Sequence, residues 1–225
     1  MRSSALKVLN LAEQLARDDQ SIIRFAGNAE AMQRFGVGLV SAFRERNAEV
    51  NFELQIDVAW DKDQLPLETG KSDLALRPLD EVSGDTLIAK KVARFPLGIY
   101  CSESYKKKYG TPSNLEETRA HKFLTFSEEI AIVMKAVRWL NDQLEPSQIV
   151  YQVNAVSSMA AALQSGDALG LLPRVTGDQT PGLIYCFGHE KLQHQLWLIA
   201  SRDSYARPTV RKFMAFAGEH FKKLN

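Results

Sequence analysis

A short pattern that occurs twice limits the folds open to this chain. Residues 163–173 read LQSGDALGLLP: the end of a helical segment, a glycine, a short apolar run and a proline. Residues 67–78, LETGKSDLALRP, repeat this order. Glycine adopts the left-handed conformation that closes a helix without a Cβ clash, and an apolar run this short is typical of a buried strand. Each copy therefore predicts a helix that turns at a glycine into a buried strand and ends at a proline; these residues are Gly70 and Pro78, then Gly166 and Pro173.

Strand-like and helix-like segments alternate around both copies. In the first half the expected order is strand 22–26, helix 30–46, strand 51–58, helix 62–69 and strand 74–77. In the second half it is helix 103–109, strand 122–126, helix 131–144, strand 149–154, helix 157–165 and strand 168–172. A helix at 3–17 precedes them, strands 86–91 and 96–101 separate them, and strand 196–201 with helix 209–224 follows. Each half reads as a βαβαβ series, so we expect an α/β fold of two Rossmann-like lobes around parallel sheets.

Ligands of open α/β sheets bind outside the carboxyl ends of the strands, where helix N-termini also point. Residues that follow the predicted strands are therefore candidates for binding a small polar or anionic molecule. In the first half they are Asn28, Ala29, Glu30, Trp60 and Asp61. In the second half they are Ser102, Phe126, Ser127, Ser157, Ser158 and Pro173. Simpler roles stay open for several of them: Asn28, Asp61 and the serines are also suited to cap helices, and Trp60 to cover a sheet edge.

Composition and motifs exclude several other functions. The net charge of +1 lacks the excess of positive charge that is typical of domains that bind nucleic acid. The apolar stretches are far shorter than the roughly 20 residues that a membrane helix needs, and the N-terminus has no secretory pattern, so we expect a cytoplasmic protein. No nucleotide loop, catalytic motif or metal-ligand spacing occurs in a supportive context, so no enzyme activity, metal or cofactor is expected. Cys101 and Cys186 lie in apolar strand-like segments and are expected as buried free thiols, with a disulfide as the alternative.

Four segments in register resemble the effector-binding domain of LysR-type transcriptional regulators. They read LETGKSDLAL, FPLGIYCSESY, VSSMAAALQSGDALGLLP and LWLIASRDSYARPTVRKFMAFAGEHF. The resemblance implies a fold like that of type 2 periplasmic binding proteins, with two chain crossovers and a small-molecule effector bound between the lobes. Lobe 1 would hold residues 21–92 plus 195–225, and lobe 2 residues 93–194. Residues 1–20 resemble the end of the linker helix that follows the winged helix-turn-helix in this family.

The resemblance also implies the partners of the domain. It implies a homodimer, or a tetramer in the full-length regulator, in which helix 30–46 packs against helix 157–165 or 131–144 of a second subunit. DNA would be bound only through the winged helix-turn-helix, which this sequence does not contain. Two other function classes stay open for this fold: an extracytoplasmic solute-binding protein, which the absence of a secretory pattern disfavours, and an enzyme, which the absence of a catalytic constellation disfavours.

Overall fold

The chain divides into two compact units. The computed structural model describes residues 22–57, 67, 70–82 and 85–223, so the helices expected at 3–17 and 62–69, with Trp60 and Asp61, lie outside the described residues. Of the described residues, those up to Arg77, Val82–Val92 and those from Trp197 form unit 1. Pro78–Glu81 and Ala93–Leu196 form unit 2. The chain therefore passes between the units more than once.

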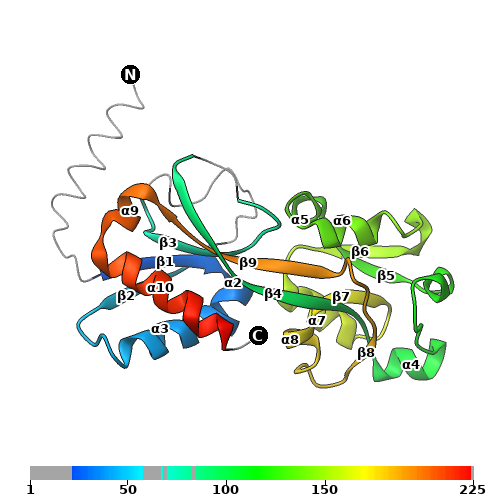
Figure 1. Ribbon diagram of the computed structural model, residues 1–225. Helices are drawn as coiled ribbons and strands as arrows, with labels where there is room; N and C mark the ends of the chain where they lie inside the picture. The colour runs from blue at the N-terminus through cyan, green and yellow to red at the C-terminus, as the bar shows by residue number, and fades with distance from the viewer. Residues whose placement is uncertain (1–21, 58–66, 68–69, 83–84, 224–225) are drawn as a thin grey trace. The chain divides into compact units, whose positions relative to one another are not determined.

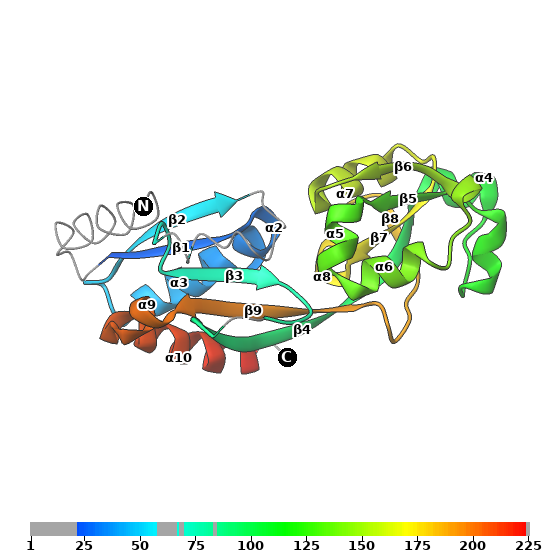
Figure 2. The same cartoon turned by 90° about the horizontal axis from the view of Figure 1, so that it is seen from above.

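Unit 1 is built on three parallel strands. They are β1 (Ile22–Asn28), β2 (Asn51–Asp57) and β3 (Leu74–Pro78), with β1 between the other two. The register pairs Asn28 with Asp57, so β1 and β2 end at the same edge. Strand β9 (Gln193–Ser201) and then β4 (Leu87–Ser102) extend the sheet beyond β3, and Figure 2 shows this order.

One continuous helical segment follows β1. It comprises α2 (Ala29–Ala31), a π-helical turn (Met32–Gly36) and α3 (Val37–Arg44), where the sequence predicts a single helix. The C-terminal helix α10 (Pro208–Lys222), preceded by α9 (Arg202–Ala206), packs against α3. The ring of Phe213 on α10 lies 5.4 Å from Phe25 on β1 and 5.1 Å from Phe43 on α3, centroid to centroid. These aromatic contacts join both helices to the sheet in one core.

Unit 2 repeats the strand order of unit 1. Strands β5 (Phe123–Phe126), β6 (Ile149–Val153) and β7 (Leu169–Pro173) are parallel, with β5 in the middle. Strand β4 pairs antiparallel with β7, and β8 (Leu183–Phe187) pairs antiparallel with β4. Helices α5 (Glu128–Val133) and α6 (Lys135–Asn141) cover one face, and α7 (Val156–Gln164) and α8 (Arg174–Gly177) the other (Figure 1). Helix α4 (Glu103–Tyr109) and the short 3-10 helices Glu116–Ala120 and Pro146–Gln148 complete the unit.

From its glycine onward, each copy of the twice-occurring pattern has the predicted conformation. Gly70 and Gly166 have φ of 69° and 89°, in the left-handed region that favours glycine. The apolar runs after them are the buried strands β3 and β7, which end at Pro78 and Pro173. The prediction of two parallel βαβ-type halves is therefore confirmed for the described strands.

Three sequence expectations were wrong in detail. The strands expected at 86–91 and 96–101 form one strand, β4, which continues from unit 1 into unit 2. The helix expected at 131–144 is interrupted at Met134, whose extended backbone (φ −125°, ψ 100°) separates α5 from α6. Helix α8 was not predicted, because four residues are too few to show a helical period, and strand β8 is missing from the expected order although the segment around Cys186 is strand-like.

No helix in the described ranges is both long enough and apolar enough to span a membrane.

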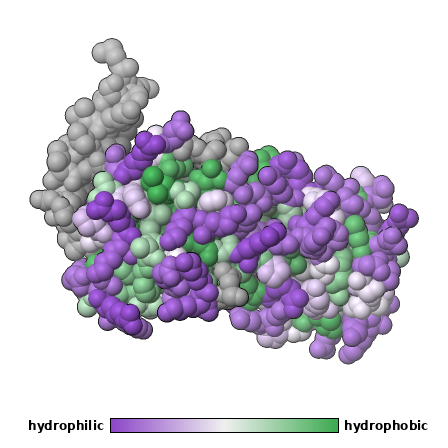
Figure 3. Space-filling view, in the orientation of Figure 1, coloured by the Kyte–Doolittle hydropathy of each residue, from purple (hydrophilic) through white to green (hydrophobic). Residues whose placement is uncertain are grey.

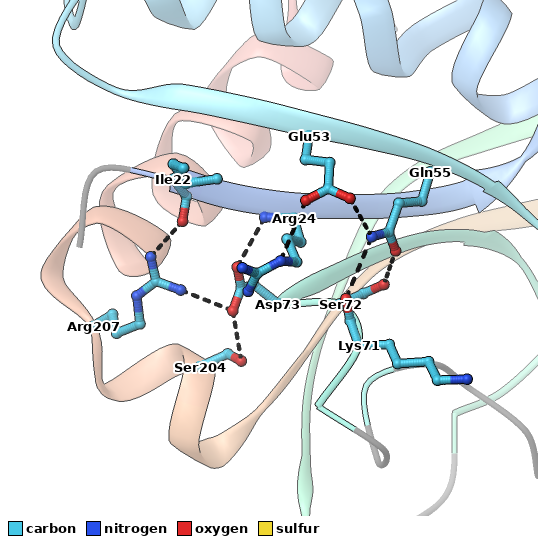
Figure 4. Close-up of polar contacts among 9 residues, drawn as sticks. All are labelled: Ile22, Arg24, Glu53, Gln55, Lys71, Ser72, Asp73, Ser204 and Arg207. Carbon is cyan, nitrogen blue, oxygen red and sulfur yellow. Dashed lines mark hydrogen bonds and ion pairs between the residues drawn. The ribbon is translucent and has the colours of Figure 1, made fainter. Parts of the chain in front are cut away.

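A buried carboxylate holds together the amino-terminal edge of unit 1 (Figure 4). Asp73, directly before β3, accepts a hydrogen bond from the backbone N–H of Arg24 on β1 (2.8 Å). Its other oxygen pairs with the guanidinium of Arg207 at 2.8 Å, and Arg207 also donates to the carbonyl of Ile22 (2.6 Å). Asp73 therefore links β1, β3 and the segment between α9 and α10. Nearby, Arg24 pairs with the exposed Glu53 at 3.3 Å.

We expect Asp73→Asn to lower the free energy of unfolding by about 1–3 kcal/mol, because it removes the charge of Asp73 from its ion pair with the half-buried Arg207 guanidinium. Chemical denaturation measures this loss. Glu53→Gln is the matched control: this carboxylate is 56% exposed, so its removal should change stability by less than about 0.5 kcal/mol. Equal losses in both variants would contradict the role given to Asp73.

His194 on β9 makes stability depend on pH. Burial lowers the pKa of its imidazole to about 4, and its Nδ1 has no hydrogen-bond partner among the described residues. The unfolded chain takes up this proton near pH 6.5, whereas the folded chain takes it up only near pH 4. Stability is therefore full above pH 6.5 and falls as the pH drops from 6.5 towards 4, by up to about 3 kcal/mol. Denaturation of the wild type and His194→Gln across this range tests it; an unchanged pH dependence in the variant would contradict this assignment.

Candidate functional site

At the carboxyl edge of unit 1, Asn28 caps the helix that follows β1. Its side-chain oxygen accepts a hydrogen bond from the N–H of Ala31 (2.8 Å), and the residue is buried. Ala29 is exposed, and Glu30 pairs with Arg34 at 3.3 Å. The capping role considered for Asn28 is therefore confirmed, and a ligand role of Asn28, Ala29 or Glu30 stays a prediction.

At the carboxyl edge of unit 2, Ser127 presents an unused hydroxyl group. Phe126, the last residue of β5, is paired with Val153 of β6, and the N–H of Ser127 donates to the carbonyl of Val153 (2.9 Å). Ser127 occupies the N-cap position of α5, but its side chain makes no capping hydrogen bond. Its Oγ is buried and has no partner among the described residues. A buried hydroxyl without a partner is costly, and a bound ligand is one way to satisfy it.

Helix α7 begins at the same edge without a side-chain cap. Its N-cap residue is Ala155, which offers no side-chain acceptor, so the N–H groups of the first turn lack intrahelical partners. Ser157 and Ser158 lie in this first turn and are exposed. They are part of the helix rather than caps, which corrects the capping alternative considered for them. Because α7 follows β6 and Ser127 follows its neighbour β5, both features share one sheet edge.

Pro173 lies at the end of β7 beside a structural cluster that the sequence did not suggest. Pro173 is buried and pairs with Leu97 of β4. The next residue, Arg174, donates to Asp178 (2.9 Å) and stacks on Tyr185, with 4.0 Å from its guanidinium carbon to the ring centroid. Asp178 also accepts a hydrogen bond from the buried Tyr100 hydroxyl, and burial is the main reason that the Tyr100 pKa is raised. The i,i+4 spacing of Arg174 and Asp178 is the one sequence signal that could have revealed this cluster.

Ser102 does not lie with the other serines. It is the last residue of β4, which runs antiparallel to β7, with Leu97 opposite Pro173 and Tyr100 opposite Gly170. Its place is therefore at the opposite edge of the unit 2 sheet from Ser127. There its buried Oγ caps α4 by accepting from the N–H of Tyr105 (3.1 Å). The expectation that all these serines share a carboxyl edge was wrong for Ser102, because it assumed that the strand at 96–101 ran parallel to the others.

The described residues offer hydrogen-bond donors and acceptors at these edges rather than reactive groups. No cluster of three or more His, Cys, Asp or Glu side chains suited to a metal ion occurs within the part of the chain that the structure describes. Trp60 and Asp61 lie outside that part. The groups at the unit 2 edge without a described partner, the Ser127 hydroxyl and the first-turn N–H groups of α7, are polar.

Comparison with known proteins places these features in context. Residues 16–222 match the family model of the LysR substrate binding domain. A curated relative, an HTH-type transcriptional regulator of Xanthomonas campestris pv. campestris (strain 8004), is 27% identical over 127 residues, which cover 56% of this chain and 37% of that protein. The match thus spans little more than a third of the relative's length.

Two solved structures have a similar fold. The effector-binding domain of QuiR, in complex with shikimate, matches with a TM-score of 0.73 and 17% identity, over 90% of this chain and 97% of that one. The regulatory domain of CrgA from Neisseria meningitidis, a LysR-type transcriptional regulator, matches with a TM-score of 0.70 and 20% identity, over 89% and 98%. At 17% and 20% sequence identity, these two similarities show a shared fold.

Proposed function

Because the chain belongs to the LysR substrate-binding domain family, we propose that it is the sensor of a transcription regulator and binds a small-molecule effector between two lobes. The match confirms the family resemblance and the α/β fold of the type 2 periplasmic-binding-protein class. The family and the named relatives are transcriptional regulators, not enzymes. We assign unit 1 and unit 2 to lobes 1 and 2, and we place the protein in the cytoplasm, where a regulator meets DNA.

The unpartnered hydroxyl of Ser127 is the observation that carries the proposed site. It lies beside the uncapped N-terminus of α7, which supplies N–H donors and a positive dipole end. A hydroxyl or carboxylate group of the effector satisfies both. Phe126, Ser157, Ser158 and Pro173 belong to this edge, and Asn28, Ala29 and Glu30 at the matching edge of unit 1 complete the proposed site. Shikimate, bound by the QuiR domain of the same fold, combines these two groups and is a natural first probe.

We expect Ser127→Ala to weaken effector binding about tenfold, the effect of losing one hydrogen bond of roughly 1–1.5 kcal/mol. Stability should change little, because the hydroxyl makes no hydrogen bond with any residue that the structure describes. A thermal-shift screen of hydroxylated carboxylic acids identifies a ligand, since binding to the folded state raises Tm, and calorimetry then measures its affinity.

Ser102→Ala is the matched control for this experiment. This serine lies at the end of a strand too, but at the opposite sheet edge, so its loss should leave the affinity unchanged. It removes a helix cap, so stability should fall by about 1 kcal/mol. A ligand whose affinity depends on Ser102 and not on Ser127 would contradict the proposed site.

The domain forms a homodimer through two exposed apolar edges. Strands β2 and β6 lie at the two ends of the strand order, and each bears large exposed apolar side chains. On β2 these are Leu54 and Ile56, and on β6 they are Val150 and Tyr151. Each of these residues is 40–57% exposed. In Figure 3 the visible surface is mainly hydrophilic, interrupted by apolar patches. We place α3 and β2 of one subunit against α7 and β6 of its partner, a closed two-fold arrangement, with a tetramer in the full-length regulator.

We expect Ile56→Asp to raise the dimer dissociation constant at least about tenfold, because it buries an unpaired charge in the interface. Sedimentation velocity over a concentration series measures this. Ile132→Asp, on α5, changes a side chain that is equally exposed at 57%, and it should leave the dimer intact. If only the Ile132 variant dissociates, the segment around 131–144 forms the interface instead of α7 and β6.

Effector binding then acts on DNA through the rest of the regulator. The domain carries a net charge of +1, which neutralises few phosphates, so the winged helix-turn-helix supplies the DNA contacts. A ligand that favours one arrangement of the lobes changes how the subunits meet. A typical coupling of roughly 1–3 kcal/mol changes DNA affinity about 5–150-fold.

A further inference from the structure

The two cysteines of the chain lie next to each other in unit 2, although they are far apart in the sequence. Cys101 on β4 and Cys186 on β8 are 85 positions apart, and their sulfur atoms are 3.6 Å apart. Both thiols are free, Cys101 fully buried and Cys186 half-buried. The effector site and the dimer interface proposed above use neither of them.

A β-bulge accounts for this proximity. Strands β4 and β8 pair Ile99 with Phe187 and Tyr100 with Tyr185, and the register shifts between these two pairs. Cys186 is the extra residue of β8 at this shift, without an opposite residue on β4. Bulges re-aim a side chain relative to the regular ladder. Here the Cys186 thiol donates a hydrogen bond to the sulfur of Cys101.

We propose that Cys101 and Cys186 are a peroxide-sensitive dithiol that forms an intramolecular disulfide. A disulfide needs a sulfur separation of about 2.05 Å, so the two side chains must approach by about 1.5 Å. Their strands are already hydrogen-bonded neighbours, so side-chain rotation can supply this movement without moving an element.

The surroundings of the pair favour a thiolate. The hydrogen bond from Cys186 and the positive charge of Lys106 on α4 hold the pKa of the Cys101 thiol below its ordinary value, against the opposing effect of burial. The same hydrogen bond, together with burial, raises the pKa of the Cys186 thiol, so Cys101 is the thiolate of the pair and Cys186 keeps its proton.

The reaction consumes one hydrogen peroxide and two thiols. The Cys101 thiolate attacks one peroxide oxygen, the O–O bond breaks, and the departing hydroxide takes the proton of the Cys186 thiol and leaves as water, with a sulfenic acid on Cys101. The Cys186 thiolate formed in this step then attacks the Cys101 sulfur, the S–O bond breaks, and the hydroxide takes a proton from solvent and leaves as water. The two electrons lost by the sulfurs reduce the peroxide, and the products are one disulfide and two waters.

Intact mass and thiol counting on the whole chain test the proposal. The reduced chain is treated with hydrogen peroxide, unfolded and alkylated. We expect both thiols to disappear together, the unalkylated mass to fall by two hydrogen atoms, and dithiothreitol to restore both thiols. A product that gains oxygen and keeps one alkylatable thiol would overturn the proposal, as would a disulfide-linked dimer.

Two single variants separate the roles of the sulfurs. Cys186→Ser leaves Cys101 without a second thiol to attack its sulfenic acid, so peroxide should give a sulfenic acid that dimedone traps once the chain is unfolded. Cys101→Ser leaves only Cys186, whose burial disfavours the thiolate, and it should react at least about tenfold more slowly than the wild-type pair. Faster oxidation of Cys186 alone than of the pair would contradict the order of steps. Because wild-type oxidation is itself the main measurement, poor folding of a variant does not remove the test.

Discussion

The direction of strand β4 sets the arrangement of the second unit. It enters beside Pro173 and runs against β7, while β5, β6 and β7 run together. One sheet therefore has two chemically different edges. The carboxyl ends of the three parallel strands define the edge where Ser127 and α7 meet. The end of β4 defines the other edge, where Ser102 caps α4 and Cys101 meets Cys186.

The two units use the same strand order but do not leave the same groups free. In unit 1 the polar side chain after β1, Asn28, is occupied by capping the next helix. In unit 2 the hydroxyl of Ser127, after β5, has no hydrogen-bond partner within the described ranges, and α7 begins without a side-chain acceptor. A buried polar group without a hydrogen bond destabilises a folded protein, because the free energy lost on removing it from water is not regained. A ligand that bonds to such a group removes this cost. This asymmetry is why the proposed effector contacts centre on unit 2.

The sequence predicts the repeated architecture well, because glycine and proline act locally. Gly70 and Gly166 adopt the left-handed backbone that glycine takes without a Cβ clash, and the strands after them are buried as expected. The direction of β4 cannot be predicted in this way, because it depends on a pairing between residues more than 70 positions apart, such as Leu97 and Pro173. The misplacement of Ser102 follows from that single error. The sequence likewise leaves open whether Cys101 and Cys186 are neighbours, because their proximity depends on a bulge between β4 and β8.

Hydrogen exchange with and without a ligand found by thermal shift tests whether the effector binds at the carboxyl edges of both units. We expect the ligand to slow exchange of the first-turn amides of α5 and α7, around Ser127–Ile130 and Val156–Met159. It should also slow exchange of the amides after β1, around Ala29–Met32. Amides around Ser102–Tyr105, at the opposite edge of unit 2, should exchange at the same rate in both states. Protection confined to that opposite edge, or to one unit alone, would contradict a ligand site built from the carboxyl edges of both units.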